Sequence, residues 1–257
     1  MSHIHPTAVI HPGARLGADC EIGPYCVVGP HVELGDGCRL HSHVVIDGHT
    51  RLGSQNEVFP FACLGKQTQD LKWNGGITRL EIGDRNTIRE GATIHTATED
   101  GHATVIGSDN HLLSYTHVAH DCVLGNRIIM SSFAGLAGHV VVEDQAVLGG
   151  YVAVHQFCRI GRLAMIGGCS KVRQDVPPFM LADGSPATTV TVNKVGLDRA
   201  GVPGETQAAL RQAYKLLFRE GLSVSTALAR IEQELPPLPE IVHLVQFVRA
   251  SQRGLSR

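Results

Sequence analysis

The chain has 257 residues, a formal net charge of −2 and a hydrophobic fraction of 43%, which is enough apolar content for the core of one or two domains. The nearly balanced charge argues against nucleic acid as the main partner. The N-terminus lacks a basic and apolar leader, and no stretch is long enough to span a bilayer, so we expect a cytoplasmic protein without an integral membrane segment.

Every sixth residue is aliphatic over most of the chain, in one reading frame, which marks an internal repeat. The series consists of Ile10, Leu16, Ile22, Val28, Leu34, Leu40, Ile46, Leu52, Val58, Leu64, Ile82, Ile88, Ile94, Ile106, Leu112, Val118, Leu124, Met130, Leu136, Val142, Leu148, Val154, Ile160, Ile166 and Val172. Five of the seven cysteines stand two positions before such a residue, and none forms a C-x-x-C pair. We interpret them as small core residues, not as disulfides or metal ligands.

A period of six suits a short strand followed by a tight corner, where Gly, Asn or Asp tolerates a positive φ. Three strands and three corners make a triangular coil of about eighteen residues, and stacked coils form parallel sheets about 4.8 Å apart. We therefore predict a mainly β fold, a left-handed parallel β-helix of hexapeptide repeats. The left hand is taken from known hexapeptide-repeat proteins, because periodicity alone does not determine it.

The repeat is interrupted twice. Asp70 and Gly76 occupy frame positions, so the chain near 66–78 is predicted to leave the coil as a loop. Asp100 does the same, which predicts a shorter loop near 96–103. A solenoid does not need such loops, and functional residues concentrate in them, although tolerated insertions are the alternative.

The hexads fade after Val172, and we divide the chain into a β-helix domain, 1–192, and a C-terminal α-helical domain, 193–257. Three helices are predicted in the second domain: 205–220 ended by Gly221, 223–234 with Ser223 as N-cap, and 239–253 between Pro239 and Gly254. These helices would cover the open end of the solenoid, where backbone pairing groups are otherwise exposed.

The coil length converts sequence spacing into geometry, because each residue stacks under the residue eighteen positions later. His120 then lies below Gly138, Gly138 lies below Gln156, and Asp121 lies below His139. A histidine, a carboxylate, a glycine backbone and an amide should therefore converge at one corner.

This set fits acyl transfer to a hydroxyl. Neutral histidine is a suitable base near pH 7, and His120 would take this role. The carboxylate of Asp121 would hold the imidazole tautomer, and the N–H of Gly138 would face the oxyanion. His117 and His155 lie near the same face.

Two other classes of protein remain open. A zinc hydratase could use His117-x-x-His120 with His139, although such sites need three histidines around an open position at a subunit interface. A catalytically silent β-helix scaffold is also compatible with the hexads, but it would have no reason to stack His120, Gly138 and Gln156.

Several blocks resemble the UDP-N-acetylglucosamine acyltransferase family, which takes the first step of lipid A synthesis. In chain order they are Gln69–Lys72, Thr78–Arg79, Glu81–Asn86, His117–Cys122, Leu136–Val140, Val154–Cys158, Gly167–Ser170, Gln174–Pro178, Ala213–Leu216 and Arg253–Leu255. The resemblance covers nearly the whole chain. Hexads alone are shared by many acyltransferases, whereas the His-rich blocks in this order, together with a helical tail, are specific.

The resemblance implies a homotrimer with active sites between subunits. It implies transfer of an (R)-3-hydroxyacyl group from acyl carrier protein to the glucosamine 3-hydroxyl of UDP-N-acetylglucosamine, without a metal or bound cofactor. His120 would be the general base, Asp121 its orienting carboxylate and Gly138 the oxyanion donor.

The resemblance also implies a set of substrate-binding residues. The sugar-nucleotide and acyl sites would be lined by Asp70, Lys72, His117, His139, His155 and Gln156. Asn193 and Arg199 would hold the UDP portion. Gly168 would mark the far end of the acyl groove, where a larger side chain would shorten the accepted chain.

The chain departs from the family pattern at His95–Thr98, where His-Arg-Gly-Thr is common, and at Val195 and Pro186. Acyl length therefore stays open, as does amide formation on a 3-amino UDP-sugar, the reaction of some relatives. A basic stripe recurs every fourth residue at Arg211, Lys215 and Arg219. It could dock an acidic acyl carrier protein, and a solvated helix face explains it equally well.

Overall fold

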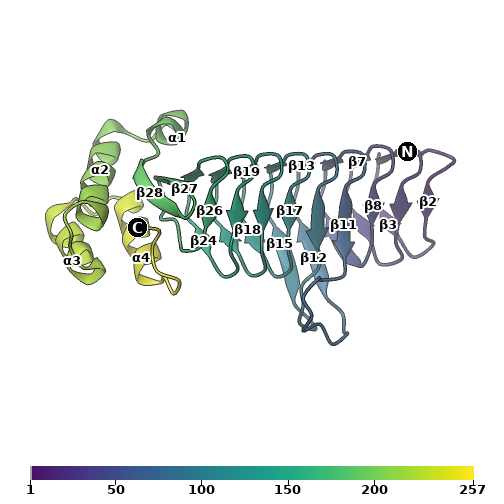
Figure 1. Cartoon of the computed structure of the whole chain (residues 1–257). Coiled ribbons are helices and arrows are strands. Elements are labelled where there is room, and N and C mark those ends of the chain that lie inside the picture. Colours follow the sequence, from purple (N-terminus) through teal and green to yellow (C-terminus); the bar gives the residue numbers. More distant parts are fainter. Residues whose placement is uncertain (1) are drawn as a thin grey trace.

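The computed structural model describes residues 2–257 as a triangular solenoid with a group of helices at its C-terminal end (Figure 1). The N-terminal coil and the helices lie at opposite ends of the solenoid axis. Within these residues three sheets, which we call A, B and C, form the three sides. The structure confirms the predicted mainly β fold, a left-handed parallel β-helix of hexapeptide repeats with C-terminal helices.

Most strands are only two residues long, because each side of a coil is short. Sheet A consists of β1 (His3–Ile4), β4 (Glu21–Ile22), β7 (Arg39–Leu40), β10 (Glu57–Val58), β13 (Thr87–Ile88), β16 (His111–Leu112), β19 (Ile129–Met130), β22 (Val147–Leu148), β25 (Met165–Ile166), β27 (Met180–Gly184) and β28 (Ala187–Val192). Sheet B consists of β2 (Val9–Ile10), β5 (Val27–Val28), β8 (Val45–Ile46), β11 (Cys63–Lys66), β14 (Thr93–His95), β17 (His117–Val118), β20 (Gly135–Leu136), β23 (Ala153–Val154) and β26 (Lys171–Val172). Sheet C consists of β3 (Arg15–Leu16), β6 (Glu33–Leu34), β9 (His49–Leu52), β12 (Arg79–Ile82), β15 (Ala103–Ile106), β18 (Val123–Leu124), β21 (Val141–Val142) and β24 (Arg159–Ile160).

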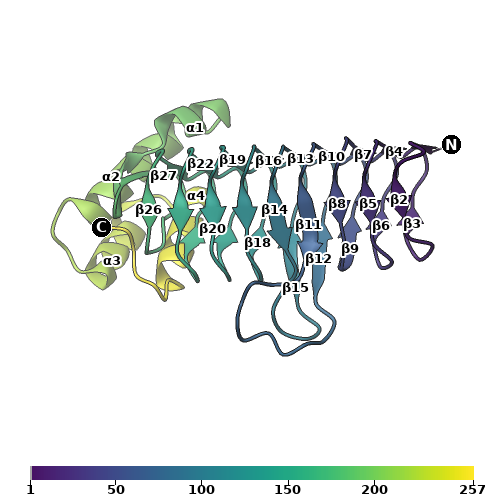
Figure 2. The ribbon, with the colours of Figure 1, turned by 45° about the vertical axis from the view of Figure 1, so that its right-hand side comes forward.

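Neighbouring coils are held in register by parallel pairing. In regular coils the partners stand eighteen positions apart, as for His117 with Gly135 and Gly135 with Ala153. The spacing widens where chain is inserted, so that Cys63 pairs with Thr93 and Thr93 with His117. The insertions leave the coil as loops between β11 and β12 and between β14 and β15, and Figure 2 shows them projecting side by side.

The aliphatic residue of each hexad points inward. From Ile22 to Val172 these side chains are all buried, whereas Ile10 and Leu16 of the first coil are half-buried because their end of the solenoid is open. The five cysteines of the repeat position are buried free thiols, which confirms that they fill the core.

The glycines that follow the aliphatic residues serve the close packing of coils. Gly35 does not have a positive φ, yet a Cβ there would lie 2.5 Å from the carbonyl carbon of Gly53 on the next coil. The left-handed conformation falls on other corner residues, including Tyr115, Phe133 and Tyr151. The prediction that Gly, Asn or Asp supplies the positive φ was therefore incomplete. At these corners the aromatic side chains project outward and stack on one another, which stabilises the conformation.

A ladder of three buried asparagines runs through the coils that carry the insertions. Asn86 Nδ2 donates to Asn56 Oδ1 at 3.0 Å, and the Asn110 N–H donates to Asn86 Oδ1 at 2.9 Å. These residues occupy the repeat position that holds cysteine elsewhere. Their amides hydrogen-bond from coil to coil, so the ladder keeps neighbouring coils in register where the sequence spacing is irregular.

The solenoid ends in an antiparallel hairpin, β27 and β28, which sequence periodicity did not reveal. The helices that follow are α1 (Lys194–Arg199), α2 (Gly204–Phe218), α3 (Val224–Glu234) and α4 (Pro239–Arg249). Ser223 caps α3 as predicted, since its Oγ accepts the Thr226 N–H at 3.1 Å. Helix α1 was missed because it is only six residues long.

Helix α4 ends four residues before the predicted boundary, because the tail turns back onto the solenoid. Leu255 forms a parallel bridge with Asp175, and the Ser256 N–H donates to the Asp175 carbonyl at 2.9 Å. The helices and the last coil share a separate hydrophobic core. No helix in the described part of the chain is long and apolar enough to cross a membrane.

Candidate active site

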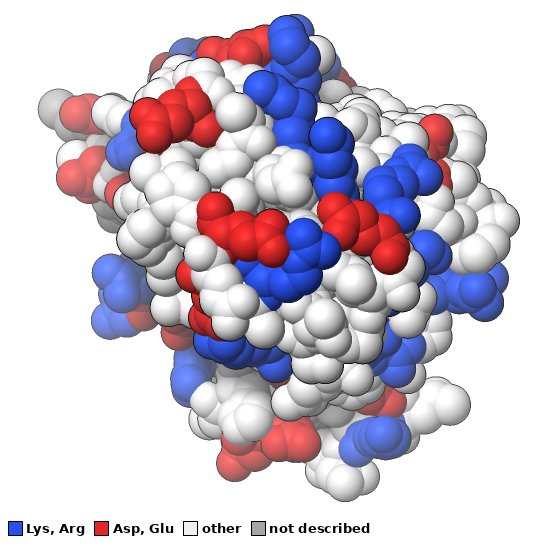
Figure 3. Space-filling view, turned by 90° about the vertical axis from the view of Figure 1, so that its left-hand side faces the viewer, with Lys and Arg blue, Asp and Glu red and all other residues white. Residues whose placement is uncertain are grey.

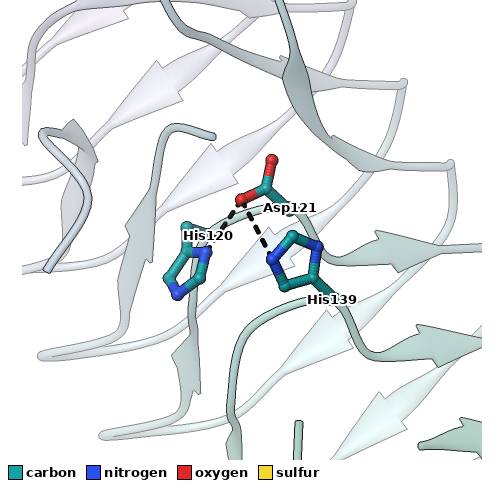
Figure 4. A group of neighbouring side chains, drawn as sticks. All are labelled: His120, Asp121 and His139. Atoms are coloured by element: carbon teal, nitrogen blue, oxygen red, sulfur yellow. Dashed lines mark hydrogen bonds and ion pairs between the residues drawn. The ribbon is translucent and has the colours of Figure 1, made fainter. Parts of the chain in front are cut away.

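The predicted column of functional residues lies at the corner between sheets B and C. His120, Gly138 and Gln156 follow strands β17, β20 and β23 of sheet B on successive coils. Figure 4 shows the rings of His120 and His139 approaching one carboxylate oxygen of Asp121 from two sides. The stacking register places these residues together as predicted.

His120 and Asp121 form a short hydrogen bond, with 2.8 Å between Nδ1 and Oδ2. Their side chains are 14% and 7% exposed. A carboxylate accepts and does not donate, so Nδ1 carries the imidazole proton. The lone pair of the neutral ring then lies on Nε2, which is the atom that can take up a proton.

The shorter insertion loop fixes the carboxylate. The Thr98 N–H donates to Asp121 Oδ2 at 3.1 Å, and the Asp121 N–H donates to Thr104 Oγ1 at 2.9 Å. Asp121 itself adopts a left-handed φ of 59°. This conformation turns its side chain toward His120 and His139 at the corner.

Gly138 has no room for a side chain. A Cβ there would lie 2.5 Å from His120 Nε2 and closer still to Cε1. The imidazole therefore rests directly against the Gly138 backbone. Within residues 2–257 the Gly138 N–H donates to no acceptor, so it is available to a ligand beside Nε2.

His139 completes this cluster from the next coil. Its Nε2 lies 3.7 Å from Asp121 Oδ2, and its ring meets His120 edge-on at 5.3 Å. The other face of the ring stacks on Phe157 at 4.6 Å. Phe157 was part of a recognised block but had no assigned role, and its position one coil after His139 is the signal that would have found it.

The longer loop brings Asp70 and Lys72 over the same corner. Asp70 Oδ2 lies 3.9 Å from His120 Nε2, and Asp70 Oδ1 accepts the Lys72 N–H at 3.0 Å. The two loops are joined by a hydrogen bond of 2.9 Å between Thr68 and Thr98. A cavity of about 560 Å³ opens between them, lined in part by Asp70, Lys72, Asp100, His139 and Phe157.

Buried His95 and half-buried His117 lie beside the base. His117 Nδ1 is 2.8 Å from Thr93 Oγ1, and His95 meets the His117 ring edge-on at 5.1 Å. Burial, followed by nearby His117 and His120, lowers the pKa of His95 to about 4. Burial and then His120 also lower the pKa of His117. Both rings therefore stay neutral near pH 7. His95 was not assigned to the site from the sequence.

His155 and Gln156 lie two coils above His120. His155 is exposed, and its Nδ1 lies 3.2 Å from the guanidinium of Arg253. Gln156 follows it in the same corner, where the next residue, Phe157, donates its N–H to the Gly138 carbonyl at 3.2 Å.

Three predicted residues lie elsewhere in the chain. Gly168 follows β25 and lies at the corner between sheets A and B. Asn193 caps α1: its Oδ1 accepts the Gly196 N–H at 3.0 Å, and its Nδ2 donates to the Leu163 carbonyl at 2.9 Å. Arg199 is the last residue of α1. A single chain therefore does not bring these residues to His120.

The donor set of the zinc alternative differs from the one expected. Within the described residues, the three groups that converge are His120, Asp121 and His139, with donor atoms within 4.8 Å of one another. His117 is not part of this group, because its Nδ1 is paired with Thr93. Asp121 Oδ2 already accepts hydrogen bonds from His120 and Thr98.

Comparison with known proteins gives full-length matches. Residues 175–256 match the family model described as Udp N-acetylglucosamine O-acyltransferase, Domain 2, and residues 13–48 match the bacterial transferase hexapeptide model. The structure of UDP-N-acetylglucosamine O-acyltransferase (LpxA) from Moraxella catarrhalis RH4 has 41% identity and a TM-score of 0.95, covering 99% of both chains. LpxA from Acinetobacter baumannii has 45% identity and a TM-score of 0.95, also over 99% of both chains. The UDP-N-acetylglucosamine acyltransferase of Bacteroides fragilis 9343 has 37% identity and a TM-score of 0.97, over 99% of this chain and 100% of that one.

Substitution of Gly138 tests the contact between the imidazole and the backbone. In Gly138→Ala the new Cβ would displace the His120 ring, because it would lie 2.5 Å from Nε2. We expect loss of the downfield Nδ1–H proton resonance of the His120–Asp121 hydrogen bond, while the circular dichroism spectrum is unchanged. Gly204→Ala is the matched control, since a Cβ there meets nothing within 4 Å. An unchanged resonance in Gly138→Ala would contradict the close packing.

The lowered pKa values of His95 and His117 predict a pH dependence of stability. The folded protein keeps His95 neutral down to a pKa of about 4, whereas the unfolded chain protonates it near 6.5. Lowering the pH from about 6.5 to about 4 therefore destabilises the fold, by about 3 kcal/mol for this residue. Urea denaturation across this window should show that the free energy of unfolding falls less steeply with decreasing pH in His95→Gln than in the native chain. The pH dependence that persists in the variant would come from His117. Identical slopes would refute the assignment.

Proposed function

Because this chain belongs to the UDP-N-acetylglucosamine acyltransferase family, we propose that it transfers an (R)-3-hydroxyacyl group from acyl carrier protein to the 3-hydroxyl of UDP-N-acetylglucosamine. This reaction would be the first step of lipid A synthesis. The observation that carries the mechanism is the 2.8 Å hydrogen bond from His120 to Asp121, which leaves Nε2 free beside Gly138.

The proposed reaction begins when His120 Nε2 removes the proton of the sugar 3-hydroxyl. The hydroxyl oxygen attacks the thioester carbonyl, and the oxyanion of the tetrahedral intermediate accepts the Gly138 N–H. Asp121 stabilises the imidazolium through Nδ1. The C–S bond then breaks, and the Nε2 proton passes to the departing pantetheine thiolate. The base is thereby restored.

The two histidines beside the base support this role. His95 and His117 have lowered pKa values and carry no charge near pH 7. Neither of these two rings would take the proton from the sugar, whereas the Nδ1–H of His120 donates to the Asp121 carboxylate and leaves Nε2 to accept it. General-base catalysis requires this definite location of the proton.

We further propose that the active site is completed in a homotrimer. The outward residues of sheet B are uncharged along most of the solenoid: Val9, Val27, Val45, Cys63, Thr93, His117, Gly135 and Ala153. Sheets A and C instead carry charged pairs, such as Arg39–Glu21 and Arg15–Glu33. Sheet B is thus the face suited to contact with other copies.

The two edges of sheet B carry the two halves of the predicted site. His120 lies at the corner with sheet C, and Gly168 lies at the corner with sheet A. When three copies pack around a threefold axis through their sheet B faces, opposite corners of neighbouring chains meet. Gly168, Asn193 and Arg199 of one copy would then contribute to the site that contains His120 of the adjacent copy. Asn193 would act by capping α1, which holds Arg199.

The donor is proposed to dock near the helices. Arg211 and Lys215 of the basic stripe are exposed, whereas Arg219 donates to the Tyr214 hydroxyl at 2.7 Å and is partly engaged. Figure 3 shows Lys and Arg side chains gathered in a band over this end, with acidic side chains beside them. An acidic carrier protein would be attracted to the band. The cytoplasmic location stays a prediction.

An acyl-transfer assay tests the function. The purified protein would receive UDP-N-acetylglucosamine, its 3-amino analogue and 3-hydroxyacyl carrier proteins of several lengths. We expect an ester product, with the rate reduced roughly 10²–10⁴-fold in His120→Ala because the general base is lost. Preference for the 3-amino analogue would replace the proposal by N-acyl transfer. A folded native trimer that is inactive with every donor would refute the acyltransferase assignment.

Metal removal is the control in the same assay. Treatment with a chelator should leave the rate unchanged, since Asp121 acts as a hydrogen-bond acceptor. Loss of activity that zinc restores would instead favour the zinc alternative.

Mixing of subunits tests the shared site. A Cβ at Gly168 would meet its nearest neighbour, the Gly150 carbonyl oxygen, at 3.4 Å, so Gly168→Met should fold. With a long-chain donor, neither Gly168→Met nor His120→Ala should be active alone. In co-assembled trimers about a quarter of the interfaces would pair an intact His120 with an intact Gly168, and activity should return in proportion. A site contained in one chain would give no recovery.

A further inference from the structure

The C-terminal tail carries a guanidinium into the candidate site. The Asp175 N–H donates to the Gly254 carbonyl at 2.9 Å, and Ser251 Oγ donates to Asp175 Oδ2 at 2.7 Å. These bonds hold the tail against the last turn of the solenoid. Arg253 is thereby placed beside His155, with 3.2 Å between Nη2 and Nδ1.

A second guanidinium belongs to the next coil. Ala153 pairs with Lys171, and the His155 N–H donates to the Val172 carbonyl at 2.9 Å. This register puts Arg173 directly above His155, and both residues are exposed. Two arginines therefore flank one histidine at the corner that also contains Gln156.

These arginines differ from the others on the solenoid. Arg39, Arg85 and Arg159 each form an ion pair with a carboxylate. Within residues 2–257 neither Arg173 nor Arg253 does so. Asp175 adjoins both, but it is fully buried and its oxygens accept the Arg159 N–H and the Ser251 hydroxyl. Two uncompensated guanidinium groups at one place favour an anion.

We propose that Arg173, His155 and Arg253 form a binding site for the diphosphate of the nucleotide-sugar substrate. Gln156 lies two coil rises from His120, about 10 Å along the axis. A nucleotide-sugar whose 3-hydroxyl lies at His120, and which extends along the axis toward the helices, would place its diphosphate at these arginines. This proposal rests on the proposed function, which supplies the nucleoside diphosphate. No role had been assigned to either arginine.

The contact with Arg253 also determines the tautomer of His155. A guanidinium donates and does not accept, so the contact with Arg253 leaves the lone pair of His155 on Nδ1 and the proton on Nε2. Nδ1 also lies 3.2 Å from the Gln156 carbonyl, a contact that would require the other tautomer. The charged donor makes the stronger bond. His155 then offers an N–H donor to a phosphate oxygen.

Direct binding of UDP tests the site without any need for catalysis. Calorimetry with UDP would compare the native trimer with Arg253→Ala, Arg253→Lys and Arg173→Ala. We expect the Kd to rise roughly tenfold to hundredfold in Arg253→Ala, and less in Arg253→Lys, because a charged hydrogen bond to phosphate is lost. In turnover, KM for UDP-N-acetylglucosamine should rise while kcat stays nearly constant.

Two variants separate binding from tail structure. Arg257→Ala removes another tail guanidinium, which contacts the Leu217 and Leu222 carbonyls at the helical end, and should leave the Kd unchanged. Ser251→Ala weakens the tail anchor but retains Arg253. If Ser251→Ala raises the Kd as much as Arg253→Ala while Arg173→Ala leaves it unchanged, displacement of the tail explains the effect and the proposed pair of arginines fails.

The same experiments show which phosphate-containing substrate binds to the arginines. A rise in KM for the acyl carrier protein, with the UDP Kd unchanged in Arg253→Ala, would assign the arginines to the phosphate of phosphopantetheine and overturn the proposal. An inactive native protein that still binds UDP through Arg253 would refute the proposed reaction while supporting this site. Equal UDP affinity in all variants would refute the site alone.

Discussion

The parallel hydrogen bonding between coils is the constraint on which the rest of the structure depends. It fixes each residue above the one eighteen positions earlier, so residues far apart in sequence become neighbours without a long loop. His120, Gly138 and Gln156 come from three coils and share one corner for this reason alone. The irregular coils need extra support, and the buried asparagine ladder supplies it where insertions change the spacing. The register of the coils therefore determines which chemical groups meet at the candidate active site.

Much of this could be predicted, because the hexad period determines both the inward column and the stacking of polar residues. Other features have no periodic signature. The tail bridge at Leu255 and the hairpin of β27 and β28 depend on tertiary contacts at the end of the solenoid. His95 follows an inward residue like many solvated side chains, yet it is buried and its ring meets that of His117 on the next coil. The resemblance placed Asn193 at the UDP portion, and in the structure its amide caps α1 and donates to the Leu163 carbonyl. Sequence spacing does not show which polar atoms are already used.

The two insertions are the elements that turn a regular corner into a site. Thr98 donates to Asp121, and Asp70 approaches His120 from the opposite loop. Without them the corner would carry the same histidine on an open surface, where water competes for every hydrogen bond. The loops leave sheet B untouched, so its uncharged outer face stays available for other copies. His120 lies at the edge of this face, so the proposed catalytic groups and the proposed trimer contact adjoin at one corner of the triangle.

At this corner the acidic and basic groups lie at different positions along the solenoid axis. Beside His120 the pKa values of His95 and His117 are lowered, and the charged partner of the His120 ring is the carboxylate of Asp121. Arg173 lies one coil beyond His155, and His155 with its neighbour Arg253 lies two coils further on than His120, about 10 Å away. At that distance two unit charges interact by roughly 0.4–1.7 kcal/mol, against roughly 1–4 kcal/mol at 4 Å. Cations that attract an anionic substrate would make a base less basic if they touched it. A separation of two or three coil rises would let the proposed diphosphate site at Arg173 and Arg253 form without contact with His120.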